Sequence, residues 1–315
     1  MSIVGGGNVG ANAAFFIAEK GVTDVLLVDI QQGLSRGKML DIMEAAPIRR
    51  YRNTLSGSDT LADITGSQIV VVAAGAIRAP GMRREELLAV NVGLIRDLAP
   101  KIARLAPEST VVIATEPVDS LTTIFVRESG MPRTRVIGLG GILDSTRLRA
   151  LIARELNLSM EVVSAMVIGR HSDDMICLPR YCSVSGVPLP LLLAQDRIAA
   201  IVEETRTAGD LVVELAKRSS SYYAPSAAVA ELADSIHMNL NRVFSVSLLL
   251  DGEYGVRNVA LSLPALIGEQ GVVRILTPEL TDEEKAVFLE SARRITAALK
   301  ENAPAAKGKV AGGAA

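Results

Sequence analysis

Tryptophan is absent from this sequence of 315 residues, and aromatic residues of every kind make up only 3% of it. The charge is nearly balanced, because 33 lysine and arginine residues face 35 aspartate and glutamate residues. Proteins that bind nucleic acids gather positive charge on one surface and usually add aromatic rings on which bases stack. This composition has neither property in bulk, so we expect no nucleic-acid partner.

Long apolar runs are also absent. The longest, at residues 69–77, is far shorter than the roughly 20 residues that a membrane-spanning helix needs. The amino end enters a glycine-rich motif at once and offers no room for a secretory signal. The two cysteines, Cys177 and Cys182, suit neither a disulfide framework nor a zinc site. We therefore expect no membrane contact, no metal, and a cytoplasmic protein with reduced thiols.

Hydrophobic residues make up 49% of the chain, which is enough for a large core, and the length predicts roughly two domains at about 150 residues each. In the first half, short apolar runs alternate with segments of helical period. The runs lie at residues 3–4, 25–28, 69–74, 111–114 and 136–137, and the helical segments at 9–20, 34–45 and 85–105. Consecutive apolar positions suit strands buried on both faces, and helical crossovers force parallel pairing. The pattern predicts an α/β fold with a doubly wound parallel sheet of the Rossmann type.

After about residue 140 the pattern becomes mixed α+β. Irregular strands are expected near residues 162–168, helices up to about 238, a hairpin from two β-type segments at 243–250 and 256–263, and a closing helix at 282–300. We place a nucleotide-binding Rossmann domain at residues 1–139 and an α+β substrate domain at 140–302. Residues 303–315, of low complexity, are expected to form a disordered tail.

Three glycines, Gly5, Gly7 and Gly10, directly follow the first apolar run, and Asp29 ends the second. In a G-x-G-x-x-G turn the glycines let the backbone approach a pyrophosphate, which also faces the amino end of the following helix. Asp29 would accept hydrogen bonds from the adenosine ribose and would repel a 2′-phosphate. The pattern favours NAD over NADP, with a purely structural tight turn as the alternative.

Histidine is as scarce as cysteine, since His171 and His237 are the only two. His171 follows an apolar strand-like run, where a loop would present it to a cleft, and we choose it for acid/base chemistry. His237 lies on a predicted helix, and a partly buried packing role is the better interpretation there.

Asp144 and Arg147 are three residues apart on a predicted helix and therefore share a face. A carboxylate can orient an imidazole and stabilise its charged form, and a guanidinium can bind a substrate carboxylate with two parallel hydrogen bonds. By spacing alone, however, an ion pair on a solvated face is the better explanation of these two residues.

Three arginines, Arg78, Arg83 and Arg84, lie around a Pro-Gly turn after the run at 69–74. This segment follows a strand at the carboxyl edge of the predicted sheet, where ligands bind, and it could close on an anion. An ordinary solvated loop is the alternative.

Together and in this order, the motifs resemble the lactate/malate dehydrogenase family, and within it the malate dehydrogenases of the lactate-dehydrogenase-like type. The resemblance covers about residues 3 to 300. It rests on the glycine turn with Asp29 and on the motifs at residues 37–41, 78–84, 117–119, 142–147, 169–173 and 222–225.

The resemblance implies that His171 exchanges a proton with the substrate, that Asp144 orients it, and that Arg147 anchors the carboxylate beside the reacting carbon. It implies that Arg84 polarises the substrate carbonyl when the loop closes. Arg78 would pair with a second carboxylate and so favour malate and oxaloacetate over lactate and pyruvate. Three guanidinium groups would then serve two carboxylates and one carbonyl.

The resemblance also implies further binding residues and an assembly. Glu116 and Ser221 would join Arg78, Arg84 and Arg147 in the substrate site. NAD would be bound by Gly5, Gly7, Asn8, Val9, Gly10, Asp29, Asn91 and Thr115. The chain would form a homodimer or homotetramer.

Three departures from the family pattern put full activity in question. Glu116 stands where an Asn is usual, and an ionised carboxylate there would oppose a dicarboxylate substrate; such a repulsion at about 4 Å is worth about 4 kcal/mol. On this basis we expect weak activity that improves at mildly acidic pH. The loop around His171 carries Arg170, Ser172 and Asp174 at positions where the family has other residues, and Ser219 stands where glycine is common.

The resemblance thus predicts an NAD-dependent malate dehydrogenase, a reaction of the tricarboxylic acid cycle, with His171 as the acid/base. Two alternatives stay open. One is a dinucleotide-binding paralogue with weak or no turnover, and the other is a dehydrogenase for another 2-hydroxy acid.

Overall fold

The computed structural model describes residues 1–76, 82, 84–217 and 221–303, and for Arg84 and Glu85 the main chain alone. Nearly all of the predicted tail at 303–315 lies outside the described residues. Among the described residues, nine strands form one sheet in the order β3-β2-β1-β4-β5-β6-β12-β13-β14. No helix among them is both long and apolar enough to span a membrane.

The first six strands of the sheet run parallel, and five of them are the predicted ones. They are β1 (Ser2–Val4), β2 (Val25–Val28), β3 (Leu55–Ser58), β4 (Ile69–Val72), β5 (Thr110–Ile113) and β6 (Val136–Gly138). Their order 3-2-1-4-5-6 is that of a Rossmann sheet. Strands β1, β4, β5 and β6 are buried at every position, which explains why their sequences are apolar without alternation.

The sheet continues into the second half of the chain. The predicted hairpin is confirmed as β12 (Arg242–Asp251) and β13 (Arg257–Gly268), and β14 (Gly271–Ile275) follows it. These strands are antiparallel, and β12 joins β6 through the pair Ser247 and Gly138.

Strand β3 was not predicted, because its sequence, Leu-Ser-Gly-Ser, has one apolar residue and no alternation. It lies at the sheet edge beside β2, and its glycine allows the strand to pack closely against the main chain of α2. A Cβ on Gly57 would lie 2.4 Å from the main-chain nitrogen of Arg36.

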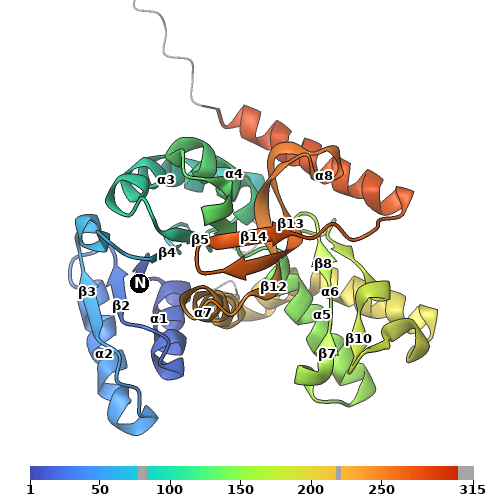
Figure 1. The fold of residues 1–315 in the computed structure, drawn as a ribbon, viewed down its shortest axis with the longest axis horizontal. Helices are drawn as coiled ribbons and strands as arrows, with labels where there is room; N and C mark the ends of the chain where they lie inside the picture. Colours follow the sequence, from blue (N-terminus) through green and yellow to red (C-terminus); the bar gives the residue numbers. More distant parts are fainter. Residues whose placement is uncertain (77–81, 83, 218–220, 304–315) are drawn as a thin grey trace, which may run out of the picture.

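Helices cover both faces of the sheet (Figure 1). One face packs against α1 (Asn8–Lys20), α2 (Leu34–Arg49), α7 (Tyr223–His237) and the start of α5 (Gly141–Leu156). The other packs against α3 (Arg84–Leu105), α4 (Val118–Ser129) and α8 (Asp282–Glu301), the predicted closing helix. Helix α4 is almost wholly enclosed, since every residue from Val118 to Val126 is buried.

A smaller core lies beside the sheet. It is built from the later turns of α5, from α6 (Gln195–Ala216), and from the short strands β7 (Val163–Ser164), β8 (Val167–Ile168), β9 (Ile176–Cys177) and β10 (Ser183–Val184). Strand β11 (Val187–Pro188) is exposed and pairs with β10. Cys177 and Cys182 are free and buried in it, as predicted. Burial raises the pKa of Cys177 to about 12 and that of Cys182 to about 11, so both remain unreactive thiols.

Candidate active site

The turn between β1 and α1 is built around glycines that approach other backbone closely. Gly5 has φ of +112°, and a Cβ on it would lie 2.5 Å from the main-chain nitrogen of Ala74. A Cβ on Gly10 would lie 2.0 Å from the carbonyl oxygen of Gly5. Gly7 differs, since a Cβ there would meet nothing within 4 Å. Gly5 and Gly10 thus pack the turn, whereas Gly7 faces open space at the amino end of α1.

Asp29 closes the far side of this turn. Its Oδ2 accepts a hydrogen bond from the main-chain nitrogen of Gly6 at 2.7 Å, and its Oδ1 accepts one from that of Gln31 at 2.9 Å. Lys38 donates from Nζ to the carbonyl oxygen of Gly6 at 2.6 Å. These contacts fix the carboxylate and the glycine turn relative to each other.

A cavity of about 630 Å³ lies over the turn, lined among others by Gly5, Gly7, Asn8, Val9, Asp29 and Asn91. It combines an open glycine, the first N–H groups of a helix, and a carboxylate at the end of the neighbouring strand. That donor and acceptor set fits the pyrophosphate and ribose of a dinucleotide.

Asn91 and Thr115 are buried and bind main chain near the ends of β4 and β5. Asn91 accepts from the nitrogen of Ala76 at 2.8 Å and donates to the carbonyl oxygen of Glu116 at 2.7 Å. Thr115 donates from Oγ1 to the carbonyl oxygen of Ala74 at 2.7 Å. In this structure both residues shape the wall of the cleft through the segments that they connect.

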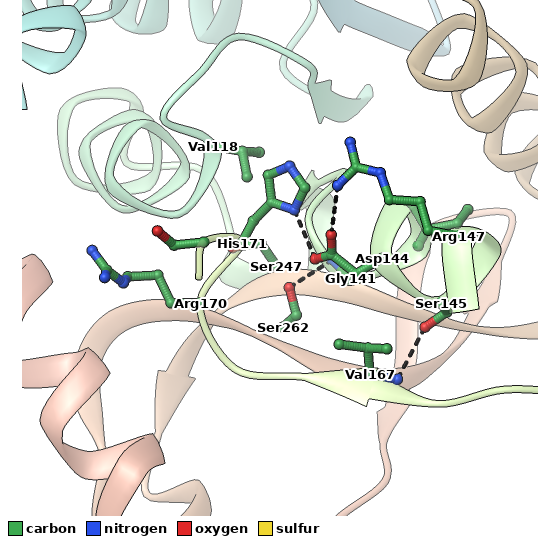
Figure 2. A network of polar contacts seen from close by, with 12 residues as sticks. Val118, Gly141, Asp144, Ser145, Arg147, Val167, Arg170, His171, Ser247 and Ser262 are labelled. Carbon is green, nitrogen blue, oxygen red and sulfur yellow. Dashed lines mark hydrogen bonds and ion pairs between the residues drawn. The ribbon is translucent and has the colours of Figure 1, made fainter. Parts of the chain in front are cut away.

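His171 and Asp144 meet in the centre of the molecule. Nδ1 of His171 donates to Oδ2 of Asp144 at 2.7 Å, and Oδ1 of Asp144 accepts from Arg147 at 3.1 Å (Figure 2). Asp144 is 1% exposed and His171 is 7% exposed. The alternative of an ion pair on a solvated face is therefore wrong: the spacing on α5 places the carboxylate between an imidazole and a guanidinium.

Two further contacts of α5, shown in Figure 2, tie this helix to the strand before His171 and to β13. Oγ of Ser145 accepts from the main-chain nitrogen of Val167, in the strand that leads to His171. The main-chain nitrogen of Gly141 donates to Oγ of Ser262 in β13, at 2.9 Å. The elements that hold Asp144 in place therefore also hold His171 in place.

Asp119 is a second buried carboxylate at His171, and the sequence did not single it out as a site residue. Its Oδ2 accepts from the main-chain nitrogen of His171 at 2.8 Å, and its Oδ1 accepts from Oγ of Ser247 at 2.6 Å. Burial raises the pKa of Asp119 to about 6, although these two hydrogen bonds and His171 act in the opposite direction. Its presence in the Pro-Val-Asp motif was the available signal.

Glu116 comes from the loop between β5 and α4. Its Oε1 lies 3.4 Å from Nε2 of His171, and its Oε2 accepts from the main-chain nitrogen of Val118 at 3.2 Å. The carboxylate therefore faces the nitrogen that would exchange a proton with a substrate.

Two adjoining cavities surround this centre. One of about 150 Å³ is lined among others by Thr115, Glu116, Arg147, His171 and Ser221. A larger one of about 580 Å³ extends from His171 and Arg147 towards α6 and α8. Gly209 of α6 lies beside Arg147, and a Cβ there would be 3.4 Å from Nη1 of the guanidinium, an ordinary van der Waals distance. The sequence did not predict that these two residues are neighbours.

The unusual residues of the histidine loop make contacts with one another. Arg170 donates from Nε to both oxygens of Asp174, at 2.8 and 3.1 Å, and Asp174 also accepts from Ser291 in α8 at 2.9 Å. Ser172 is not among the described residues with positive φ, so a glycine is not required there. The loop is thus tied to α8 rather than distorted.

Arg78 and Ser219 lie outside the described residues, as does the side chain of Arg84. The packing role expected for His237 is wrong, because its side chain is exposed at the last turn of α7, where the chain turns away from the core.

Nearly the whole chain is similar to known proteins. Residues 1–138 match the model for the NAD binding domain of lactate/malate dehydrogenase, and residues 142–305 match that for its alpha/beta C-terminal domain. The chain belongs to the lactate/malate dehydrogenase family. As a member of this family it is an NAD-dependent oxidoreductase, so the predicted family, fold class and cofactor are confirmed.

Individual members of the family are similar over nearly their full length. A malate dehydrogenase of Desulforudis audaxviator is 40% identical over 95% of this chain and 97% of its own. The malate dehydrogenase structure from Aeropyrum pernix has a TM-score of 0.91 at 39% identity, covering 95% of this chain and 97% of that one. A lactate dehydrogenase of Cryptosporidium parvum, solved with lactic acid and nicotinamide adenine dinucleotide, has a TM-score of 0.92 at 33% identity and covers 96% and 98%.

The glycine turn yields a first prediction from a matched pair of variants. Gly7→Ala adds a methyl group to open space and should leave the free energy of unfolding within about 0.5 kcal/mol of wild type, but lower NADH affinity at least tenfold, because the methyl group occupies the dinucleotide cleft. Gly10→Ala should destabilise the fold by about 2 kcal/mol or more, because its Cβ meets the Gly5 carbonyl. Urea unfolding and NADH fluorescence titration measure both effects, and normal NADH binding by Gly7→Ala would contradict this placement of the cofactor.

Asp119 yields a second prediction, on pH dependence. Its pKa is raised from 3.8 to about 6 in the folded state, so the protonated form is favoured by folding. The contribution of Asp119 to the free energy of unfolding should therefore be most favourable below about pH 4 and should fall by up to about 3 kcal/mol as the pH rises through 6. Asp119→Asn should remove this dependence in urea unfolding at pH 4, 5 and 8.

The same variant should lower kcat at pH 8 about tenfold or more, because the main chain of His171 loses a charge-assisted hydrogen bond. Ser247→Ala is the matched control, since it removes the other partner of Asp119 and leaves the contact to His171. A similar loss of kcat in both variants would indicate a general packing effect instead.

Proposed function

We propose that this chain catalyses the NAD-dependent interconversion of malate and oxaloacetate. The observation that carries the proposal is the buried pair of His171 and Asp144 with Arg147 beside it, at the wall of a cavity that adjoins the dinucleotide cleft. The relatives named malate dehydrogenase, at about 40% identity over nearly the whole chain, support the same assignment.

In malate oxidation, Nε2 of His171 takes the proton of the substrate hydroxyl, and in the reverse direction it returns a proton to the carbonyl oxygen. Asp144 keeps the imidazole oriented and stabilises its charged form. NAD, when bound, supplies the acceptor or donor of the hydride at the same carbon.

The substrate is held by charge. Arg147 offers part of its guanidinium to the carboxylate next to the reacting carbon, while one of its N–H groups remains on Asp144. We assign the second carboxylate to Arg78 and the polarisation of the carbonyl to Arg84, on the strength of the family motif at residues 78–84. Ser221 lines the smaller cavity and is assigned to the substrate site with them.

The dinucleotide is assigned to the first part of the chain. Gly5, Gly7, Asn8, Val9, Gly10 and Asp29 would hold the pyrophosphate and ribose, with Asn91 and Thr115 shaping the cleft nearer to His171. We place the boundary between the NAD-binding and substrate domains near residue 140, with residues 140–302 in the second.

We propose a homodimer or homotetramer in the cytoplasm. Support for assembly comes from exposed apolar side chains on helix surfaces, such as Ile48 at 81% and Leu215 at 71%. Free buried thiols suit a reducing compartment. Sedimentation equilibrium and cell fractionation decide these two points.

The activity itself is tested by following NADH oxidation with a panel of 2-oxo acids. We expect oxaloacetate to be reduced with a higher kcat/KM than pyruvate, because two carboxylates can be paired with guanidinium groups. No NADH oxidation with any 2-oxo acid, or a preference for pyruvate, would refute the proposal.

The specificity assignment is tested with Arg78→Gln. This change removes one charge-assisted pair and should lower the ratio of kcat/KM for oxaloacetate to that for pyruvate by at least tenfold, or about 1.4 kcal/mol. Arg83→Gln serves as the matched control for loss of an arginine from the same segment. An unchanged ratio in Arg78→Gln would show that this residue does not contact the second carboxylate.

A further inference from the structure

The imidazole of His171 lies between two carboxylates. Nδ1 is 2.7 Å from Oδ2 of Asp144, and Nε2 is 3.4 Å from Oε1 of Glu116. The two carboxylates have different surroundings, since the Asp144 side chain is 1% exposed and that of Glu116 is 35% exposed. Asp144 is therefore a fixed partner, whereas Glu116 lies at the open side of the imidazole.

The contact to Glu116 is supported from the other side of its carboxylate. Oε2 accepts from the main-chain nitrogen of Val118, the first residue of α4. The geometry therefore brings a carboxylate oxygen towards the nitrogen that the proposed reaction uses.

Other charged groups among the described residues lie around His171. Asp119 lies at the start of α4, Asp144 and Arg147 on α5, and Arg170 and Asp173 on its own loop. The larger cavity is also lined by charged residues of α6 and α8, namely Arg206, Asp210, Arg294 and Glu301. Asp119 contacts the main chain of His171, Asp144 contacts Nδ1, and Glu116 lies 3.4 Å from Nε2.

We propose that Glu116 is a positioning residue that holds the proton on Nε2 of His171 until a substrate arrives, and that the substrate oxygen takes its place. The inference rests on the proposed function in one respect, because it takes Nε2 as the atom that exchanges a proton with the substrate. It adds a role for a residue that the sequence presented simply as a charge opposed to the substrate.

Two consequences follow from the geometry. A carboxylate at Nε2 favours the protonated imidazole, so the free enzyme remains competent for reduction to a higher pH than it would without Glu116. A substrate oxygen must come within about 3 Å of Nε2 to receive the proton. Glu116 then has to give up that contact, which makes substrate binding weaker without affecting the proton transfer that follows.

Glu116→Gln separates these consequences, because it keeps the size of the side chain and removes its charge. At pH 6 we expect KM for oxaloacetate to fall about tenfold while kcat changes by less than about threefold. The midpoint of the alkaline decline in kcat/KM should move down by about one pH unit, a factor of about ten in proton affinity. The kcat/KM of Glu116→Gln should therefore be about tenfold higher than that of wild type at pH 6 and should become equal to it at high pH.

Glu301→Gln is the matched control. Glu301 lines the larger cavity from the end of α8 and is exposed, and no contact between it and His171 is among those described. Its removal should move the midpoint by less than about 0.3 pH unit. Glu116→Asp, which keeps the charge on a shorter side chain, should retain a midpoint closer to wild type than Glu116→Gln does.

The proton on His171 can also be followed directly, because the chain has only two histidines. In a His237→Gln background, NMR titration of the remaining imidazole should show a midpoint about one pH unit lower when Glu116→Gln is added, and an unchanged midpoint when Glu301→Gln is added. An equal midpoint with and without Glu116 would overturn the inference, as would parallel kcat/KM profiles over the whole pH range.

The titration does not depend on turnover, so the two proposals fail separately. If no 2-oxo acid is reduced by any variant, the proposed function is wrong, and the titration still decides whether Glu116 holds the proton. If oxaloacetate is reduced and the midpoint is unaffected by Glu116, the function stands and the inference fails.

Discussion

Parallel pairing of short, fully buried strands is the constraint on which the rest of this structure depends. Strands β1, β4, β5 and β6 contain apolar residues at consecutive positions, and such strands are stable only where helices cover both faces. Because the pairing is parallel, the carboxyl ends of the strands lie at one edge of the sheet. At that edge lie the glycine turn, the segment at Thr115 and Glu116, and the start of α5, because each comes directly after a strand.

The second half of the chain brings the imidazole to this edge. Strand β8 leads into His171, and the main-chain bridge between Gly169 and Ser262 ties the loop to β13. Because β12 and β13 continue the sheet, the loop is held by the same framework as the cofactor cleft. The reacting groups are thus fixed by buried main-chain hydrogen bonds and not by flexible surface contacts.

Buried carboxylates then set the electrostatics of the centre. A buried charge is costly unless it is paired and hydrogen bonded. Asp144 meets this requirement through His171 and Arg147, and Asp119 through His171 and Ser247, although burial still raises the pKa of Asp119 to about 6. Both carboxylates contact His171, Asp144 at Nδ1 and Asp119 at the main-chain nitrogen, which couples the stability of the fold to the geometry of the site.

The sequence by itself determined the parallel pairing of the buried strands, the glycine turn with Asp29, and the shared helix face of Asp144 and Arg147, because these depend on periodicity, spacing and local motifs. It could not supply β3, whose single apolar residue gives no strand signal, nor the role of Asp119, whose partners Ser247 and His171 are distant in the chain. It presented Glu116 as an isolated charge, and the tertiary structure alone placed that carboxylate against Nε2 of His171. The physical reason is that contacts between residues far apart in sequence depend on how loops from different strands converge at the sheet edge, and no local pattern encodes that convergence.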